Sequence, residues 1–353
     1  MTDRNYKIAE GETYKILSSA EANYFFNKKT GYMVSWGKTV DDDVKVFPAP
    51  ALLDIEVTTK CSGVNGKVCP FCYKANTPDG ENMSFETYKA ILDKFPNVLT
   101  QVAFGADATL TSNPDLWKMM EYTRSKGIVP NITAAQISEA VADKLAKYCG
   151  AVAISVYSDH DVAYDSIYKL TSRGMRQVNI HLMISQETYN NAVEVLNDCK
   201  TDQRLRGLNA VVFLSLKQKG RGTGHHPLTQ EQFNSLVELA LKNNVRVGFD
   251  SCSSVKVFSA FSDKPEMKFV EQSIIPCEST IESSYCNVKG QFFPCSFMEG
   301  TEGWETGLDV VGCNDFIEDI WNNPRTEEFR NTLLATAVSD SKCSCRSCPY
   351  YEV

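Results

Sequence analysis

Short apolar segments rich in β-branched residues recur through the middle of the chain, and longer segments with helical periodicity separate them. The apolar segments predict strands at residues 52–58, 99–104, 128–133, 151–157, 177–184, 209–216 and 245–249. The segments between them predict helices at residues 84–94, 114–126, 136–148, 163–173, 188–199 and 229–243. Because strand and helix alternate throughout, we expect right-handed βαβ crossovers and a parallel sheet.

The number of strand–helix repeats narrows the fold class. Six or seven units are fewer than the eight of a closed α/β barrel, so we expect an α/β protein with a partial (β/α)6-type parallel barrel, or an open parallel sheet as the alternative. In such a fold the loops that follow the strands meet at the carboxyl edge of the sheet, where ligands bind. Candidate chemistry is therefore expected in these loops.

The pattern also predicts how the chain is divided. Residues 1–50 would form an N-terminal cap, since residues 23–36 have the pattern of a hairpin that turns near residues 29–31. Residues 51–250 would form the barrel and residues 251–276 a connector. Residues 277–353 would form a small cysteine-rich extension with a candidate metal site.

Composition adds one unusual feature, which is 13 cysteines in 353 residues. No apolar signal segment follows the N-terminus and no apolar stretch approaches the length of a membrane span, so we expect a cytoplasmic protein that does not bind a membrane. Thiols are kept reduced there, which favours metal binding or catalysis over disulfides. The net charge of −8 argues against a nucleic-acid partner.

The first cysteine group follows the first predicted strand directly. Cys61, Cys69 and Cys72 lie in one loop. Three thiolates are one fewer than a closed structural zinc site needs. An iron–sulfur cubane held by three cysteines instead leaves one iron open for another ligand. This loop therefore predicts a cluster with a free coordination position.

The segment Cys69-Pro-Phe-Cys72, in the loop after the first strand of a partial barrel, resembles the signature of the radical S-adenosylmethionine (SAM) superfamily. The resemblance implies a [4Fe–4S] cluster on Cys61, Cys69 and Cys72, with the amine and carboxylate of SAM on the fourth iron. Reductive cleavage of SAM, driven by an external flavodoxin or ferredoxin type donor, would yield a 5′-deoxyadenosyl radical that abstracts hydrogen from substrate. Phe71 would pack near the adenine, and the Tyr73 backbone would contact it.

The spacing departs from the commonest family pattern. Seven residues separate Cys61 from Cys69 where the family usually has three, and two of the seven are Gly63 and Gly66. Extra loop residues cost little closure entropy, so a glycine-containing loop can still bring three sulfurs to one cluster. The longer spacing bears on which subgroup of the superfamily the chain resembles, and less on whether the loop binds a cluster.

A second landmark follows the second predicted strand. Gly105, Ala106 and Asp107 stand where the family has a Gly-Gly-Glu-Pro turn whose backbone meets the SAM amino group. The resemblance implies further SAM contacts near the ends of later strands, at Ser155, Ser158, Asn179, His181 and Leu216. The alternative for each of these is an ordinary side chain of the barrel interior or of a helix-facing surface.

The C-terminal segment contains seven cysteines around a predicted hairpin at Lys289-Gly290 and a predicted helix at 316–334. It resembles the SPASM and twitch extensions of radical SAM enzymes, which hold auxiliary [4Fe–4S] clusters. The implied ligands of one auxiliary cluster are Cys277, Cys295, Cys345 and Cys348, with Cys286, Cys313 and Cys343 as competitors. A second cluster with an open iron stays an alternative, and so does a zinc ribbon.

Three weaker signals remain. Asp250 and Cys252 follow the last predicted strand, so Asp250 could act as a base and Cys252 could return a hydrogen atom to a substrate radical; the alternative is a small buried residue. Residues 220–227 predict a flexible loop that covers substrate or faces solvent, and a metal site is a further alternative. Cys149 and Cys199 lie at helix ends and are expected to be inert.

These observations predict a radical SAM enzyme of oxidoreductase type. The first substrate hypothesis is oxidation or crosslinking of a peptide or protein side chain. The second is dehydrogenation or rearrangement of a small metabolite, nucleoside or sugar. Residues 1–50 make this alternative more attractive, because they are too short for the leader-binding domain of some peptide-modifying members. A hypothesis of another class is a non-catalytic zinc-binding protein.

Overall fold

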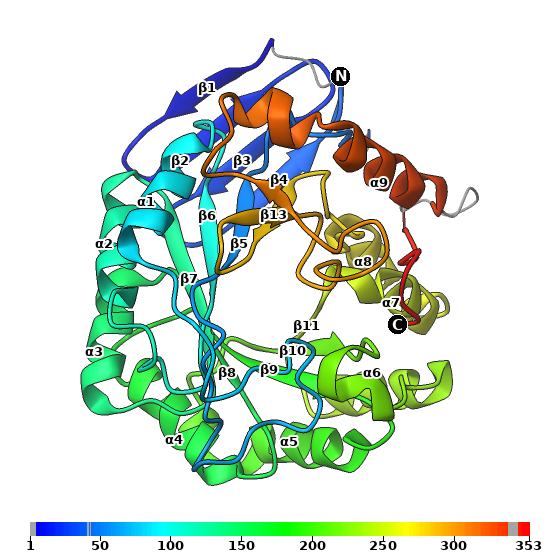
Figure 1. Cartoon of the computed structure of the whole chain (residues 1–353). Coiled ribbons are helices and arrows are strands. Elements are labelled where there is room, and N and C mark those ends of the chain that lie inside the picture. The colour runs from blue at the N-terminus through cyan, green and yellow to red at the C-terminus, as the bar shows by residue number, and fades with distance from the viewer. Residues whose placement is uncertain (1–4, 41, 43, 338–344) are drawn as a thin grey trace.

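The computed structural model describes residues 5–40, 42, 44–337 and 345–353. Among these residues, one sheet has four antiparallel strands in the order β1-β2-β3-β4, and a second has ten in the order β11-β10-β9-β8-β7-β6-β5-β12-β13-β14. The larger sheet curves around the middle of the molecule (Figure 1). No described helix is both long enough and apolar enough to cross a membrane.

The predicted alternation of strand and helix is confirmed. The strands are β5 Leu52–Glu56, β6 Gln101–Gly105, β7 Val129–Ala134, β8 Val152–Ser155, β9 Val178–Ile184, β10 Ala210–Ser215 and β11 Val247–Phe249, and all pair in parallel. The helices are α1 Phe85–Lys94, α2 Leu116–Ser125, α3 Glu139–Tyr148, α4 His160–Thr171, α5 Tyr189–Thr201 and α6 Gln230–Lys242. They line the outer side of the curved sheet (Figure 1).

Local capping explains most helix starts. The Ser84 hydroxyl accepts from the Thr87 N–H at the start of α1, and Thr229 forms a capping box with Gln232 at α6. The predicted start of α2 at residue 114, capped by Asn113, is wrong because α2 begins at Leu116. The Asn113 amide instead donates to two backbone carbonyls near the cysteine loop, so its side chain holds the loop.

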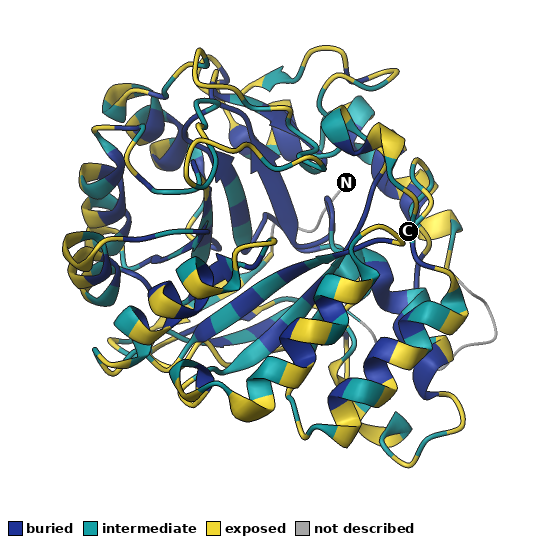
Figure 2. Cartoon of the chain, turned by 90° about the horizontal axis from the view of Figure 1, so that it is seen from below, coloured by how far each residue is buried: buried dark blue, intermediate teal, exposed yellow. Residues whose placement is uncertain are grey.

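Alternation along the strands divides the sheet into two faces. In β9 the residues Val178, Ile180 and Leu182 are fully buried in the main hydrophobic core, whereas Asn179 and His181 between them are partly buried and lie outside that core. Side chains of a strand point to opposite faces in turn, so the apolar set packs under the helices and the polar set lines the barrel interior. Figure 2 shows buried residues along the strands and exposed residues on the outer sides of the helices.

The N-terminal sheet covers the amino end of the barrel. Its strands are β1 Lys7–Glu10, β2 Tyr14–Ser18, β3 Asn23–Asn27 and β4 Met33–Trp36, and the last two form the hairpin that the pattern of residues 23–36 indicated. Its buried side chains pack on Val98 and Val129, which lie at the amino ends of β6 and β7. The buried Lys15 Nζ donates to the Leu99 carbonyl over 3.0 Å. The carboxyl end of the sheet is left for ligands.

The C-terminal segment lengthens the sheet beyond the six or seven strands expected. The predicted hairpin forms β12 Ser283–Cys286 and β13 Gln291–Phe293, but β12 also pairs in parallel with β5, and β14 Leu308–Asp309 follows β13. Residues 251–276 carry α7 Ser254–Phe261 and α8 Met267–Ser273. The helix predicted at 316–334 is two elements, a π-helical turn Ile317–Trp321 and α9 Pro324–Ala335, because Pro324 starts a new helix.

Candidate functional site

The three cysteines of the first group lie on the loop between β5 and α1, at the carboxyl end of the sheet. The seven residues that separate Cys61 from Cys69 fold on themselves, since Val64 and Lys67 exchange backbone hydrogen bonds of 3.1 and 2.9 Å. Asn65 and Gly66 between them both have positive φ, 51° and 76°, as a two-residue hairpin of type I′ requires. The longer spacing is thus absorbed by a local turn.

Gly63 fits this turn closely. Its φ is 72°, and a Cβ at this position would overlap the Lys67 carbonyl. Its N–H donates to the Cys61 sulfur at 3.4 Å. Backbone donors to cysteine sulfur are a feature of iron–sulfur sites, where they tune the cluster.

The three thiols gather near Tyr157, which follows β8. Burial raises the pKa of Tyr157, and the charges of Cys69, Cys72 and Cys61 raise it further. A hydrogen bond from the Cys69 thiol is the largest cause that lowers the pKa of Cys72, and the backbone N–H groups of Asn76 and Lys74 act in the same direction. The same hydrogen bond raises the pKa of Cys69, so within this pair Cys72 is favoured as the thiolate, the form that ligates metal.

Arg221 fastens this loop from the other side of the barrel. Its Nε donates to the Cys69 carbonyl at 2.9 Å, its Nη1 to the Asn76 carbonyl at 3.0 Å, and its own N–H to the Cys72 carbonyl at 3.0 Å. Gly220 has φ 57°, and a Cβ there would overlap the Tyr73 carbonyl. The loop predicted to be flexible at 220–227 instead begins with a 3-10 turn, Gly220–Gly224, that docks on the cysteine loop.

Two aromatic residues of the loop point to different surroundings. The Phe71 ring lies 5.4 Å from the Tyr157 ring and 6.1 Å, edge on, from the His225 ring. The Tyr73 ring instead lies 4.4 Å from the Phe297 ring of the C-terminal segment. Phe71 thus faces the barrel strands, and Tyr73 joins the loop to the extension.

Several predicted cofactor contacts line the barrel interior. Ser155 forms a hydrogen bond with Tyr157, and Thr133 with the Nδ1 of His181 at 3.2 Å. Burial lowers the pKa of His181 to about 4, so the imidazole is neutral at pH 7. Asn179 accepts from the Asn209 amide at 2.9 Å.

Other predicted contacts lie elsewhere. Both carboxylate oxygens of the buried Asp107 accept hydrogen bonds from its own loop, at residues 109–112, so this side chain shapes the turn that begins at Gly105 and Ala106. Leu216 is buried against Gly222. Ser158 is exposed and lines a separate cavity with residues of α4 and α5, away from Ser155.

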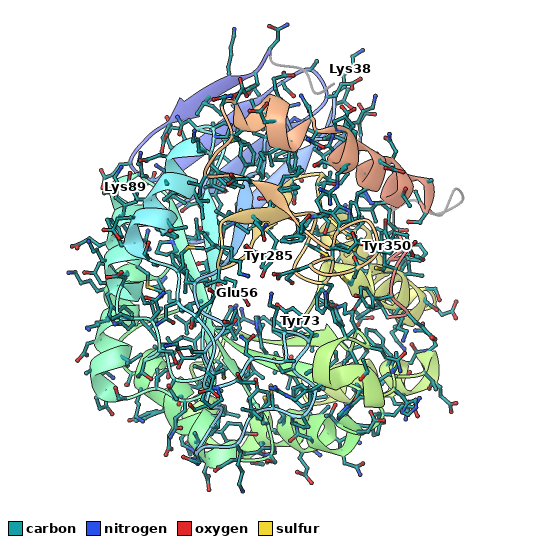
Figure 3. All side chains as sticks on the ribbon, viewed as in Figure 1. Lys38, Glu56, Tyr73, Lys89, Tyr285 and Tyr350 are labelled. Carbon is teal, nitrogen blue, oxygen red and sulfur yellow. The ribbon has the colours of Figure 1, made fainter. Side chains whose placement is uncertain are left out.

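An ion-paired network lies between the loop and the C-terminal hairpin. Lys74 pairs with Glu56 at 3.2 Å and with Glu299, and it donates to the Tyr285 hydroxyl at 2.9 Å. The Asn287 amide donates to Glu299 at 2.8 Å. Glu56, Lys74, Asn287 and Glu299, together with Tyr73, line a cavity of about 570 Å³. Figure 3 shows Glu56, Tyr73 and Tyr285 around the middle of the molecule.

The C-terminal cysteines separate into two places. The buried Cys277 accepts a hydrogen bond from Cys252, and electrostatic interactions link these two thiols with Cys295 and Cys348. Cys345 is buried near this group and disulfide-bonded, and its Sγ lies 4.0 Å from the Ser254 carbonyl. Cys343 lies outside the described residues.

Cys286 and Cys313 lie apart from this group. Cys286 aligns with Ile55 in the β12–β5 register, within the core under the helices, and its interacting thiol is Cys313. Lys94 at the end of α1 donates to the Cys313 carbonyl at 2.5 Å. The structure therefore brings Cys277, Cys295 and Cys348 together but does not add Cys286 or Cys313 to them.

Within the described residues, no three His, Cys, Asp or Glu side chains converge closely enough to hold a single metal ion. A cubane places each thiolate on a different iron, so its ligands stand farther apart than those of one zinc ion. The loop with Cys61, Cys69 and Cys72 fits such a cluster by its free thiols, its backbone donor at Cys61 and the lowered pKa of Cys72.

Sequence reasoning missed several residues of the cysteine loop's surroundings and of the ion-paired network beside it, which are Glu56, Lys74, Tyr157, Arg221 and Glu299. It also missed Lys217, which forms an ion pair with Asp250. Lys217 directly follows an apolar strand, and Arg221 stands between two glycines. Charged residues at the carboxyl end of a strand were therefore an available signal. The partner of each charge comes from a distant segment, and no local pattern indicates it.

Comparison with known proteins gives matches only among solved structures. No protein-family model matches the chain, and no curated protein does. The chain is similar to BtrN in complex with AdoMet and 2-DOIA, with 12% identity over 86% of this chain and 95% of that one and a TM-score of 0.45. It is similar to coproporphyrinogen III oxidase HemN from Escherichia coli, a radical SAM enzyme, with 11% identity, 84% and 86% coverage and a TM-score of 0.44.

A third structure is the HpcH/HpaI aldolase from Desulfitobacterium hafniense DCB-2, with 9% identity over 60% of this chain and 84% of that one and a TM-score of 0.34. These identities and scores are low. The functional argument therefore rests on the residues of this chain.

Proposed function

We propose that this chain is a radical SAM enzyme that binds its [4Fe–4S] cluster through Cys61, Cys69 and Cys72. The observation that carries the proposal is the gathering of these three free thiols, from one loop at the carboxyl end of a parallel sheet, near Tyr157. When bound, the cluster and SAM would supply a 5′-deoxyadenosyl radical that abstracts hydrogen from substrate.

The chain's own residues prepare this site. Gly63 donates its N–H to the Cys61 sulfur, and Arg221 holds the backbone at Cys69. Phe71 forms an apolar wall with Tyr157. The neutral His181 offers a hydrogen bond inside the barrel without adding charge. Because the N-terminal sheet covers the amino end, SAM and substrate would enter at the carboxyl end.

The proposed substrate is a peptide or protein side chain, which the enzyme would oxidise or crosslink. The second candidate is a small polar metabolite, nucleoside or sugar, and the cavity beside Tyr73 favours it. A volume of about 570 Å³ is in the range of small-molecule sites, and its wall offers both lysine donors and carboxylate acceptors, among them Lys74 and Glu299.

Two further components belong to the proposal. One is an external electron donor of flavodoxin or ferredoxin type, as the family resemblance implies. The other is an auxiliary [4Fe–4S] cluster bound by cysteines of the C-terminal segment. The grouping of Cys277, Cys295 and Cys348 supports it.

The test is anaerobic reconstitution with iron and sulfide, followed by incubation with SAM and dithionite. We expect a brown protein that forms 5′-deoxyadenosine, and loss of this product in Cys69→Ala. Cys149→Ala removes a buried thiol far from the loop and serves as the matched control, with product formation unchanged. A colourless protein that holds only zinc and cleaves no SAM would contradict the proposal.

A further inference from the structure

Asp54 is an acidic residue in the middle of β5, on the inward face of the curved sheet. Its strand neighbours Leu53 and Ile55 are 0% and 1% exposed and belong to the main hydrophobic core under the helices. Because side chains alternate between the two faces of a strand, Asp54 points into the barrel, as Glu56 does. Asp54 is only partly buried, so its side chain keeps accessible surface on this face.

The positions beside Asp54 offer its carboxyl no partner. The residue opposite it on β6 is Ala103, and the residue opposite it on β12 is Tyr285. The Tyr285 hydroxyl donates to Glu56 and Glu299, at 3.3 and 3.1 Å. Asp54 therefore has a methyl group on one side and, on the other, a hydroxyl that other carboxylates engage.

No hydrogen bond or ion pair within the described part of the chain involves the Asp54 carboxyl. Glu56, two residues further along the strand, instead pairs with Lys74 at 3.2 Å. Burial raises the pKa of Asp54 to about 7, and no positive charge or donor acts against this. A carboxylate taken out of water without a partner lowers the stability of a fold. Such groups are typical of binding and catalytic sites, where function outweighs stability.

Asp54 also lies below the cysteine loop. The ion pair of Glu56 with Lys74, which is two residues after Cys72, places that loop over the carboxyl end of β5. Inward-facing residues of one strand follow each other at about 7 Å, so Asp54 is one such step deeper than Glu56. A molecule held at Asp54 would therefore lie beneath the loop of the proposed cluster.

The ionisable groups around this position are mostly acidic. Glu56 and Glu299 share the cation Lys74 between them, and Glu278, in the segment before β12, adds a further carboxyl near Asp54. The cation that this part of the barrel contains is thus already engaged by two carboxylates. A positively charged group of a ligand fits these surroundings, and an anionic group does not.

We propose that Asp54 binds an ammonium group of the substrate, so that the substrate is an amine. The ammonium would donate hydrogen bonds to the carboxylate and supply the positive charge that the protein does not place there. The inference rests on the proposed function and narrows both of its substrate hypotheses. A small metabolite would be an amino compound, and a peptide side chain would be that of lysine.

The experiment measures the binding of matched probes to the reconstituted protein with SAM and without reductant, by calorimetry at pH 8. One arm compares 4-aminocyclohexanol with 1,4-cyclohexanediol, and the other compares Nα-acetyl-lysine amide with Nα-acetyl-norleucine amide. We expect an amine to bind at least about tenfold more tightly than its neutral counterpart. The arm in which this occurs distinguishes a small amine from a lysine side chain.

Variants assign the preference to Asp54. Asp54→Asn keeps the size of the side chain and removes its charge, so the amine should lose about tenfold in affinity and the neutral counterpart should not change. The exposed Asp263 supplies the matched control Asp263→Asn, which should bind as the unmodified protein does.

Urea denaturation separates a binding role from a structural one. The pKa of Asp54 is higher in the folded chain than in the unfolded chain, so its ionisation destabilises the fold as the pH rises toward 7 and above. We expect Asp54→Asn to raise the urea midpoint, and by more at pH 8 than at pH 5. A lower midpoint at pH 8 would show that Asp54 serves the fold, and it would overturn the inference.

Equal amine affinity in Asp54→Asn and the unmodified protein would also overturn it. The same holds if a neutral counterpart binds as tightly as its amine, or if neither amine binds. These readouts need no reductant, whereas the proposed function fails if the reduced protein forms no 5′-deoxyadenosine. The two failures are therefore distinguishable.

Discussion

Arg221 holds the cysteine loop through backbone carbonyls and not through the thiols themselves. We expect Arg221→Gln to remove the guanidinium bonds to Cys69 and Asn76, at a cost of about 2 kcal/mol, because hydrogen bonds from charged donors contribute more than neutral ones. Chemical denaturation measures the loss, and iron content after reconstitution should fall by half or more. The exposed Arg206 supplies the control Arg206→Gln, which should change neither quantity.

His181 gives a pH dependence with a defined sign. Burial lowers its pKa from 6.5 to about 4, so the unfolded chain binds a proton in a pH range where the folded chain does not. Its contribution to the free energy of unfolding is complete above pH 6.5 and is lost as the pH falls toward 4. We expect urea midpoints of His181→Asn to decrease less between pH 7 and pH 5 than those of the unmodified protein. Parallel curves for the two proteins would contradict this.

Two glycines with positive φ, Gly63 and Gly66, shape the turn in the cysteine loop. Gly63→Ala should open the turn, because the added methyl overlaps the Lys67 carbonyl, and iron at this loop should be lost. Gly66→Ala meets no atom and should cost only about 1–2 kcal/mol for its positive φ, with iron retained. Gly174→Ala, with φ 79° and open space far from the loop, is the matched control. Equal iron in all three variants would show that the turn does not position the thiols.

The ion network joins three elements, so its loss should affect their packing. Lys74→Met leaves Glu56 and Glu299 without their cation, and we expect a loss of about 3 kcal/mol in the free energy of unfolding. The double variant with Glu56→Gln should lose less than the single one, because one buried charge is removed. Lys89→Met breaks an exposed pair at the edge of the molecule (Figure 3) and should cost below about 0.5 kcal/mol.

Elements with strong local patterns could be predicted from the sequence, and elements defined by distant partners could not. The strands and helices of the barrel follow from periodicity and caps such as Ser84 and Thr229. The hairpin at Lys289-Gly290 is a local turn signal, but nothing local indicates that β12 pairs with β5. The docking of Gly220 likewise depends on the Tyr73 carbonyl, which lies in another loop.

At the scale of the whole molecule, the part of the candidate site with a local motif could be predicted, and the part formed by distant segments could not. The three-cysteine loop and its place after β5 were predictable, because the motif is short and continuous. The grouping of Cys252 with the C-terminal cysteines could not be predicted, because Cys252 and Cys348 come together only when the barrel and the C-terminal segment pack. The prediction grouped the C-terminal cysteines by nearness in sequence, whereas Cys286 and Cys313 lie on the helix-covered side of the sheet.

The pairing of β12 with β5 has a consequence for the synthesis of the protein. The Lys74–Glu299 contact spans 225 residues, so the cysteine loop leaves the ribosome long before its last partners exist. Contacts of such separation form late in folding. We therefore expect a ribosome-released chain, and no shorter nascent chain, to accept iron at Cys61, Cys69 and Cys72. Cofactor insertion would then be a maturation step that follows translation.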